Sequence, residues 1–374
     1  MSDIYNRCYA EVDLSAIEHN LNELKSCLDS GVMALAVVKA NAYGHGAVAV
    51  ARHIEDKVDY FGVATLDEAV ELREAGIRKP VLIFSYTSPT LYSVIIDKDI
   101  TPTIYNTDEA KALSALAKKI GKRVKIHVCV DTGMGRIGFS PDECGADAVK
   151  EISGLDGVWV EGLFSHYACA DSADKRDAQA QTALFDSFIS MLDARGVNIP
   201  IKHICNSAAT IEGEKQYSMC RLGIALYGIY PSDEVRRDRV KLIPAMKVVS
   251  HVIHIKRVPK GFKIGYGHIY EAEDERTVAT VSIGYADGFR RCLYNEGYVL
   301  IRGKVARVVG KVCMDQIMVD VTDIQGVKVD DEAVILGESG DKRISAEALG
   351  SMSHSFSYEV VCDFSHRVKR IYKK

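Results

Sequence analysis

The sequence lacks the features that would direct a chain into a membrane or through a secretory route. No apolar run approaches the roughly 18 residues that a transmembrane helix needs. The N-terminal residues up to Asp13 do not show the basic and then apolar pattern of a signal peptide. The ten cysteines form no Cys-x-x-Cys pair and no Cys/His cluster at zinc spacing. We therefore expect reduced thiols, no bound metal, no membrane partner and a cytoplasmic location.

An excess of one charge is missing as well. The chain has 47 basic and 51 acidic residues, which gives a formal net charge of -4. This balance indicates neither a nucleic-acid-binding protein nor one that binds acidic lipids. Apolar residues make up 47% of the 374 residues, so the chain can bury large cores, and its length suggests two domains. A small molecule is the expected partner.

The first two thirds of the chain alternate short apolar runs with helical patterns. In segments such as 66–74, 107–119 and 180–195, apolar residues recur at three- and four-residue steps. Eight buried strands joined by helices are typical of a closed parallel (β/α)8 barrel, and an open doubly wound sheet is the alternative. A barrel would carry its chemistry at the C-terminal ends of its strands. The eight runs cover 32–38, 60–64, 81–84, 101–105, 124–130, 158–164, 201–205 and 222–227.

The pattern changes after Pro244. Six short strand patterns with glycine-containing turns follow, interrupted by one short helix over 345–352. The start of the chain, 9–12, also reads as a strand, and we expect it to pair with the C-terminal part. The predicted organisation is therefore an N-terminal strand segment (1–12), a cofactor-binding barrel (13–244) and a mainly β domain (245–374).

Lys39 follows the apolar run that ends at Val38, so the barrel prediction places it at the mouth of a strand. A lysine that loses hydration there has a lowered pKa, and its neutral amine can form an imine. A strand-end lysine that merely extends its amine into water is the alternative. The glycines within 44–46 match a dinucleotide-binding loop only in part, because Ala49 stands at the third glycine position.

Other predicted strand ends also carry glycine-rich or polar sequence. Segment 131–138 has closely spaced glycines beside Arg136, a fixed cation, and a tight turn with a surface arginine is the alternative. Asn206 and Ser207 could add side-chain donors, and 221–224 lies where barrels often bind phosphate. Tyr285 ends a strand of the second domain, where a packing role is the alternative.

Taken in order, these segments resemble the alanine racemase family, which has the group III pyridoxal-phosphate fold. The resemblance implies a (β/α)8 barrel followed by a mainly β domain. It also implies a head-to-tail homodimer, in which each active site combines the barrel of one subunit with the β domain of the other. The matching segments are 37–46, 131–138, 165–166, 206–207, 221–224, 283–288, 313–315 and 357–360.

The resemblance further implies roles for individual residues. Lys39 would hold pyridoxal 5′-phosphate as a Schiff base, His166 would lie beside the pyridine ring, and Arg221 would face the ring nitrogen. The cofactor-binding set is Lys39, Tyr43, His166, Asn206, Ser207, Arg221, Gly223, Ile224 and Tyr358. The substrate-binding set is Arg136, Met314 (through its backbone N–H) and Asp315.

The implied reaction interconverts L-alanine and D-alanine, and D-alanine is a precursor for cell-wall peptidoglycan. Lys39 would serve one face of the substrate carbon as acid or base, and Tyr285 of the other subunit would serve the opposite face. His166 and Arg221 would assist the tyrosine as a hydrogen-bonded relay. An arginine at the ring nitrogen would keep that nitrogen unprotonated and limit transamination.

One position departs from the family pattern. Many members carry a carbamylated lysine two residues before the Asp-Thr-Gly segment, and this chain has Cys129 there. We therefore expect Arg136 to lack that anionic neighbour. Three alternatives stay open: a racemase for serine or for a broader range of amino acids, a group III decarboxylase, and a carrier of pyridoxal phosphate. Tyr358 favours alanine, Arg221 disfavours the decarboxylase, and the second domain disfavours the carrier.

Overall fold

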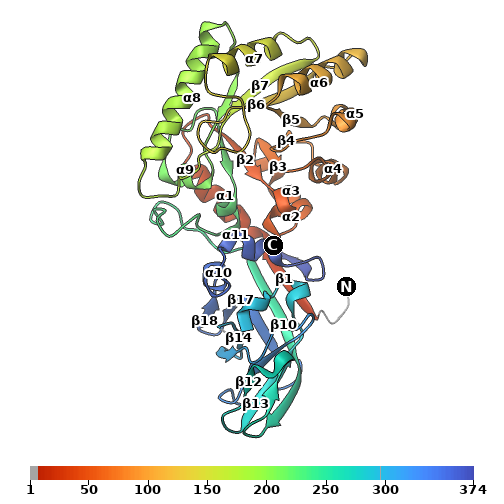
Figure 1. The fold of residues 1–374 in the computed structure, drawn as a ribbon, viewed down its shortest axis with the longest axis vertical. Helices are drawn as coiled ribbons and strands as arrows, with labels where there is room; N and C mark the ends of the chain where they lie inside the picture. The colour runs from red at the N-terminus through yellow and green to blue at the C-terminus, as the bar shows by residue number, and fades with distance from the viewer. Residues whose placement is uncertain (1–6, 295) are drawn as a thin grey trace. The chain divides into compact units, whose positions relative to one another are not determined.

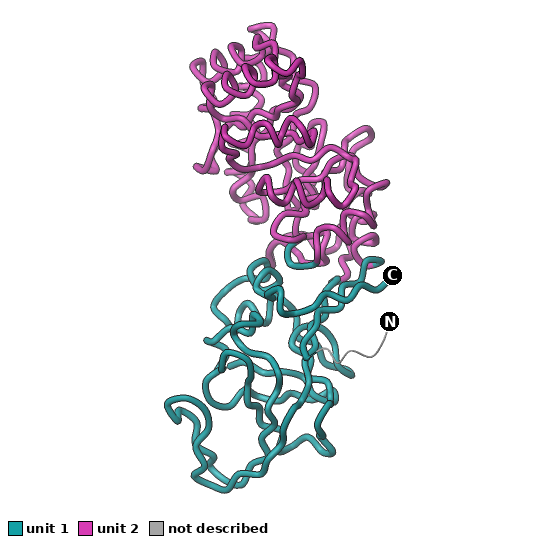
Figure 2. Tube along the Cα trace, turned by 90° about the vertical axis from the view of Figure 1, so that its right-hand side faces the viewer, with its two compact units in different colours: residues 1–15, 43–45, 244–374 teal, residues 16–42, 46–243 magenta. Residues whose placement is uncertain are grey.

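The structure, a computed structural model, describes residues 7–294 and 296–374. The chain forms two compact units (Figure 2). One unit comprises 16–42 and 46–243, and the other comprises the residues up to 15, 43–45 and 244–374. No helix among the described residues combines the length and the apolar character needed to cross a bilayer.

The larger unit is built on eight parallel strands whose spatial order follows the chain, with β9 placed beside β2. Two hydrogen bonds link the remaining edges, from Ser218 N to Lys202 O (3.0 Å) and from Arg221 N to Cys205 O (3.1 Å), so the barrel is nearly closed. The predicted (β/α)8 fold class is confirmed. The strands are β2 (Met33–Val37), β3 (Tyr60–Val63), β4 (Val81–Ile83), β5 (Thr101–Ile104), β6 (Val124–Cys129), β7 (Val158–Phe164), β8 (Ile201–His203) and β9 (Met219–Leu222).

Helices lie around these strands (Figure 1). Local sequence sets where several of them begin. Thr65 and Glu68 form a capping box at the start of α4, and the side chain of Asn106 caps α6 by accepting from Asp108 N at 2.8 Å. The main helices are α1 (Leu14–Ser26), α3 (Ala47–Ile54), α4 (Leu66–Glu74), α5 (Tyr92–Asp97), α6 (Thr107–Lys119), α7 (Glu143–Ser153), α8 (Arg176–Ala194) and α9 (Ser207–Glu212).

The smaller unit is organised by a nine-stranded sheet. The N-terminal strand β1 lies inside it, antiparallel to β10 (Ala10 opposite Val248) and parallel to β19 (Ala10 opposite Arg370). The strands are β1 (Cys8–Asp13), β10 (Met246–Val258), β13 (Arg276–Val281), β14 (Tyr298–Ile301), β15 (Lys304–Arg307), β16 (Ile317–Asp320), β17 (Glu332–Ser339), β18 (Lys342–Ile344) and β19 (Lys369–Lys373).

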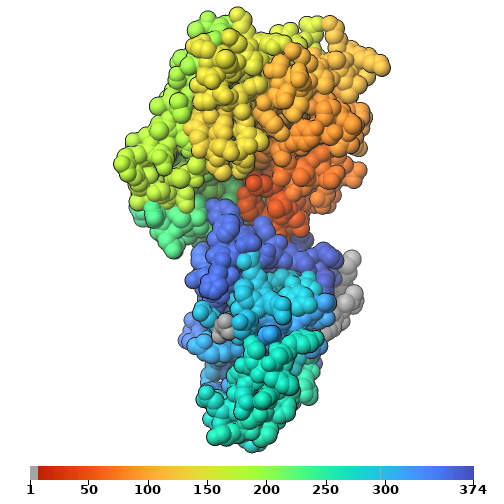
Figure 3. All heavy atoms as spheres, viewed as in Figure 1, coloured from red at the N-terminus to blue at the C-terminus, as the bar shows by residue number. Residues whose placement is uncertain are grey.

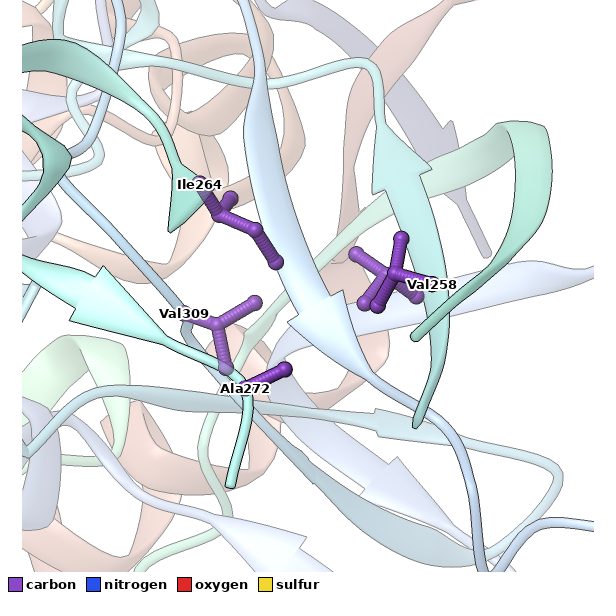
Figure 4. Packing of buried hydrophobic residues seen from close by; sticks show 5 residues of the cluster. Val258, Ile264, Ala272 and Val309 are labelled. Carbon is purple, nitrogen blue, oxygen red and sulfur yellow. The ribbon is translucent and has the colours of Figure 1, made fainter. Parts of the chain in front are cut away.

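Two helices and a hairpin complete this unit. The helices are α10 (Ala346–Met352), which Ser345 caps, and α11 (Ser357–Asp363), which the sequence patterns did not predict. The hairpin of β11 (Lys263–Ile264) and β12 (Tyr270–Glu271) lies in the teal part of the unit's surface in Figure 3. Ile264 of this hairpin and Ala272, the residue after β12, pack with Val258 and Val309 in a buried apolar cluster (Figure 4).

Candidate active site

Lys39 is the first residue of an unusual turn that leaves β2. The next four residues, Ala40 to Tyr43, all have positive φ between 49° and 54°, so α2 (Lys39–Tyr43) contains a left-handed turn without glycine. This conformation costs about 1–2 kcal/mol per residue, and such strain is concentrated at functional sites. Asn41 holds the turn, since its Oδ1 accepts the N–H of Ala47 at 2.8 Å. The path of the chain next to Lys39 is therefore fixed.

Arg221, on β9, is the buried cation of the barrel, with 3% of its surface exposed. Its Nη1 donates to His203 Nδ1 (2.8 Å), and its Nη2 donates to His166 Nδ1 (3.0 Å) and to the carbonyls of Ser165 and Ile204. Burial lowers the pKa of the guanidinium to about 10, which still leaves it charged at neutral pH. No carboxylate among the described residues pairs with it directly.

The two histidines beside Arg221 are neutral. A guanidinium can only donate, so Nδ1 of His166 and Nδ1 of His203 must each accept, and the proton of each neutral ring lies on Nε2. Burial, followed by the charge of Arg221, holds the pKa of both rings well below the usual value of 6.5. Arg136 and Lys39 add to this effect at His166, which places their charges near its ring. His166 therefore presents an N–H donor.

A polar chain continues from His203 into the barrel interior. His203 Nε2 lies 2.9 Å from His127 Nδ1, and His127 Nε2 lies 3.7 Å from Glu161 Oε2. Tyr60 Oη donates to Glu161 at 2.9 Å, and Lys125 Nζ pairs with it at 2.7 Å. Burial opposes ionisation of Glu161, but the nearby His127 and the contacts from Lys125 and Tyr60 outweigh it and lower the carboxyl pKa to about 2.

The sequence reasoning missed this chain. Its signal was a titratable side chain at a buried position of a mostly apolar strand: His127 in β6, Glu161 in β7 and His203 in β8. Gln181 was missed as well. Its amide donates to the carbonyl of His166 at 2.9 Å and accepts from Ala168 N at 2.9 Å, so it fixes the backbone that carries His166.

The ends of β8 and β9 bring two predicted cofactor-binding segments together. Ser207 is buried, and its hydroxyl accepts the N–H of Gly223 at 2.8 Å. Ile224 begins the short 3₁₀ helix η3 (Ile224–Tyr227) directly after Gly223. The side-chain oxygen of Asn206 caps α9 by accepting from Ala209 N at 3.0 Å. Asn206 thus has a structural role here, and its contact with a cofactor stays a prediction.

These donors fit pyridoxal 5′-phosphate. Hydrogen bonds to the described residues use the two terminal nitrogens of Arg221 and leave its Nε–H for an acceptor such as a ring nitrogen. Hydroxyl and backbone N–H groups near Ser207 and Ile224 suit phosphate oxygens. Lys39 supplies an amine at the C-terminal end of a barrel strand, where barrel enzymes carry their chemistry.

Cys129, the one position that departs from the family pattern, ends β6, and Arg136 lies in the loop that follows. Asp131 Oδ1 accepts the N–H groups of Gly133 and Gly135, each at 3.0 Å, which shapes the loop. Arg136 is exposed, and within the described ranges no carboxylate forms an ion pair with it. Cys129 is buried, and burial raises the pKa of its thiol to about 12, so it is neutral. Cys129 therefore supplies no anion to Arg136.

Tyr285 and Met314 lie side by side in the smaller unit. Tyr285 N donates to Cys313 O, and Ala286 N donates to Met314 O, each at 3.0 Å. A side chain on Gly284 would place its Cβ 2.4 Å from both of these carbonyl oxygens, so only glycine allows this approach. Tyr285 and Met314 are 43% and 52% exposed. Both side chains thus project from a tightly bonded pair of turns.

The remaining predicted phosphate residues, Tyr43 and Tyr358, contact each other within the same unit. Their ring centroids are 6.3 Å apart in an edge-on arrangement. Burial, followed by the nearby Tyr358, raises the pKa of Tyr43, so its phenol stays protonated. Arg370 anchors the adjoining backbone by donating to Gly44 O at 2.8 Å. Residues 43–45 are thereby tied to the smaller unit.

The nearly closed barrel carries a strand-end lysine and a buried arginine, and a mainly β unit follows it, which is the architecture expected of a barrel-type pyridoxal-phosphate enzyme. The chain matches the family models for the N-terminal domain of alanine racemase over 12–231 and for its C-terminal domain over 245–372. The chain therefore belongs to the alanine racemase family. The predicted family and enzyme class, an isomerase, are confirmed.

Similar proteins cover nearly the whole chain. An alanine racemase of Methanococcus maripaludis is 44% identical over 97% of this chain and 98% of its own length. The structure of an alanine racemase from Clostridium difficile is 42% identical, with a TM-score of 0.95 over 99% of this chain and 97% of that one. A histidine racemase from Leuconostoc mesenteroides is 29% identical, with a TM-score of 0.91 over 100% of both chains.

Proposed function

We propose that the protein is a pyridoxal-phosphate-dependent alanine racemase that interconverts L-alanine and D-alanine and supplies D-alanine for cell-wall synthesis. The observation that carries the proposal is Arg221, a buried guanidinium between two neutral imidazoles with its Nε–H unused by the described residues. A group III decarboxylase would require a carboxylate at that position. Family membership and the similarity to alanine racemases support the same activity.

When bound, pyridoxal phosphate makes the α-proton of the amino acid acidic by taking up charge in its ring. Racemisation then needs one proton-transferring group on each face of the substrate carbon. The Lys39 amine serves one face, from the end of a barrel strand. Tyr285 of the partner subunit serves the other. The N–H on Nε2 of His166 can donate to the phenol oxygen and stabilise its anionic form.

Arg221 limits the reaction to proton exchange. A guanidinium does not give up its proton at neutral pH, so an acceptor facing its Nε–H stays unprotonated. A carboxylate at this place would instead keep such an acceptor protonated and favour transamination, so the guanidinium limits that side reaction. His166 and His203 allow the charge to persist in a buried place because both accept a hydrogen bond from Arg221 and neither is cationic.

The protein acts as a homodimer with shared sites in this proposal. Tyr285, Met314 and Asp315 would complete the site of the partner subunit, and the Met314 N–H would bind the substrate carboxylate. The exposed side chains of Tyr285 and Met314 support such a role, since they project from a fixed backbone. A cytoplasmic location completes the proposal.

Serine or a larger amino acid is the second candidate substrate. The observation that favours testing it is the structural neighbour named histidine racemase, which shares the whole fold at 29% identity. Tyr358 supports alanine in the proposal because the family resemblance places its large ring at the entrance of the site, where it would exclude longer side chains.

Two measurements test the proposed function. Borohydride reduction of the loaded enzyme followed by peptide mass spectrometry should place the cofactor on Lys39, and Lys39→Ala should abolish the adduct. A panel of L-amino acids followed by chiral chromatography should show D-alanine as the main product. Serine turnover equal to that of alanine would overturn the substrate assignment, and an adduct on another lysine would overturn the site.

A further inference from the structure

Asp287 is a fully buried carboxylate two residues after Tyr285. It ends the short 3₁₀ helix η5 (Tyr285–Asp287), and its Oδ2 accepts the N–H of Gly284 at 2.9 Å. Its Oδ1 forms ion pairs with Arg7 and with Arg367, the latter at 3.3 Å. A buried carboxylate is tolerated only when it is paired and hydrogen-bonded, so these two guanidiniums are what allow Asp287 to be charged here.

The same two arginines also hold the neighbouring turn. Arg7 Nη1 donates to the carbonyls of Ser282 (2.9 Å) and Asp315 (3.2 Å). Arg367 Nη2 donates to Asp315 Oδ1 at 2.7 Å. Asp287 is thus the shared anion of a cluster that joins the strand end before Tyr285 to the turn that carries Met314. All of these residues belong to the smaller unit.

The backbone around Asp287 is fixed on its other side as well. Ser365 N donates to Asp287 O at 3.1 Å, and Ser365 Oγ donates to Ala286 O at 2.9 Å. Tyr285 itself enters none of these side-chain bonds, and the described hydrogen bonds of this turn engage its backbone. The cluster therefore orients the Tyr285 side chain through the main chain, without touching the phenol.

We infer that Asp287, with Arg7 and Arg367, is a positioning residue that sets the direction of the Tyr285 phenol and of the Met314 N–H. This inference rests on the proposed function, in which Tyr285 exchanges a proton on one face of the substrate only. Lys39 belongs to the barrel unit, whereas Asp287, Arg7 and Arg367 all belong to the smaller unit that carries Tyr285. Loss of the Asp287 charge should therefore affect the two faces unequally.

Asp287→Asn is the test, because the amide keeps the shape and the acceptor for Gly284 N–H but loses the charge. At saturating alanine, racemisation should fall about 100-fold, the loss expected for a displacement of about 1 Å of a reacting group. Exchange of the α-hydrogen with deuterated solvent, with retention of configuration, should persist for the enantiomer that Lys39 deprotonates. For the other enantiomer it should fall together with racemisation.

A second measurement does not require the enzyme to contain pyridoxal phosphate. Amide hydrogen–deuterium exchange of peptides spanning 283–290 and 312–316 should become faster in the variant without cofactor, and peptides of the barrel should be unchanged. The matched control is Asp320→Asn, which breaks an ion pair with Arg276 in the same unit and should leave both readouts as in the wild type. If Asp287→Asn does not fold, Arg367→Gln removes one of the two partners of Asp287 at a half-exposed position.

Equal loss of exchange on both faces, or racemisation at the wild-type rate, would overturn the positioning role. A wild-type protein that fails to racemise any amino acid would overturn the proposed function instead. The two failures are therefore distinguishable, since the first is seen only in an active wild-type background.

Discussion

Arg221 donates from Nη1 to Nδ1 of His203 over 2.8 Å, and this bond sets the tautomers of His203 and of His127 next to it. Because His203 accepts at Nδ1, it must donate from Nε2 to His127. His127 in turn directs its Nε2–H towards Glu161, 3.7 Å away. The hydrogen bonds run from the guanidinium to His127, and the Glu161 carboxylate lies just beyond hydrogen-bond distance of that ring, so a negative charge stands behind the cation without direct contact.

Arg221→Lys should lower racemisation about 100-fold and raise the amount of pyruvate formed per racemisation event. A single ammonium cannot serve the four acceptors that the guanidinium fork reaches, and it can pass a proton to a ring nitrogen. Chiral chromatography and a pyruvate assay measure the two products. Arg237→Lys, at an exposed pair with Asp233, is the control and should change neither. An unchanged ratio of pyruvate to D-alanine would contradict the role given to Arg221.

Glu161→Gln should destabilise the protein at neutral pH by roughly 1–3 kcal/mol, since it leaves Lys125 and His127 without their anion. The folded-state pKa of Glu161 is about 2, below its usual value, so the ionised form is the one that the fold stabilises. The contribution of ionised Glu161 to the free energy of unfolding is fully present above the unfolded pKa of about 4.3. It is lost as the pH falls towards 2.

Denaturant unfolding of wild type and Glu161→Gln at several pH values checks this window. The difference in unfolding free energy should be constant from neutral pH down to about 5 and should shrink below it. Glu151→Gln removes an exposed pair with Lys111 and should cost less than about 0.5 kcal/mol. A difference that grows as the pH falls would show that Glu161 is protonated in the folded state.

The sequence predicted the barrel because its strands are mostly apolar runs and most of the segments between them show a helical period. The polar chain through the interior could not be predicted in the same way. His127, Glu161 and His203 lie on three different strands, and only the closure of the barrel brings them together. The strand β19 and the helix α11 were missed because their charged and mixed sequences lack a clear period. The placement of 43–45 in the smaller unit follows from tertiary contacts alone.

Added bicarbonate should leave the activity of the wild type unchanged after removal of dissolved carbon dioxide. The Cys129 thiol is buried with a pKa of about 12, and a thiol cannot form the carbamate that a lysine forms at this position in many relatives. Cys129→Lys should acquire a bicarbonate dependence, and Cys129→Ala should not. A clear bicarbonate response of the wild type would mean that another residue carries the carbamate.

Mixing two inactive variants should restore activity if the sites are shared between subunits. Lys39→Ala removes a barrel group and Tyr285→Ala removes a group of the β unit, so each homodimer would lack one group in both of its sites. In a mixed dimer, one site would contain both substitutions and the other would contain neither. Random exchange of an equal mixture therefore predicts recovery of about a quarter of the wild-type activity. The mixture is assayed after mild denaturation and refolding, with each variant refolded alone as the control. No recovery, in a mixture that forms mixed dimers by mass spectrometry, would show that both groups act within one subunit.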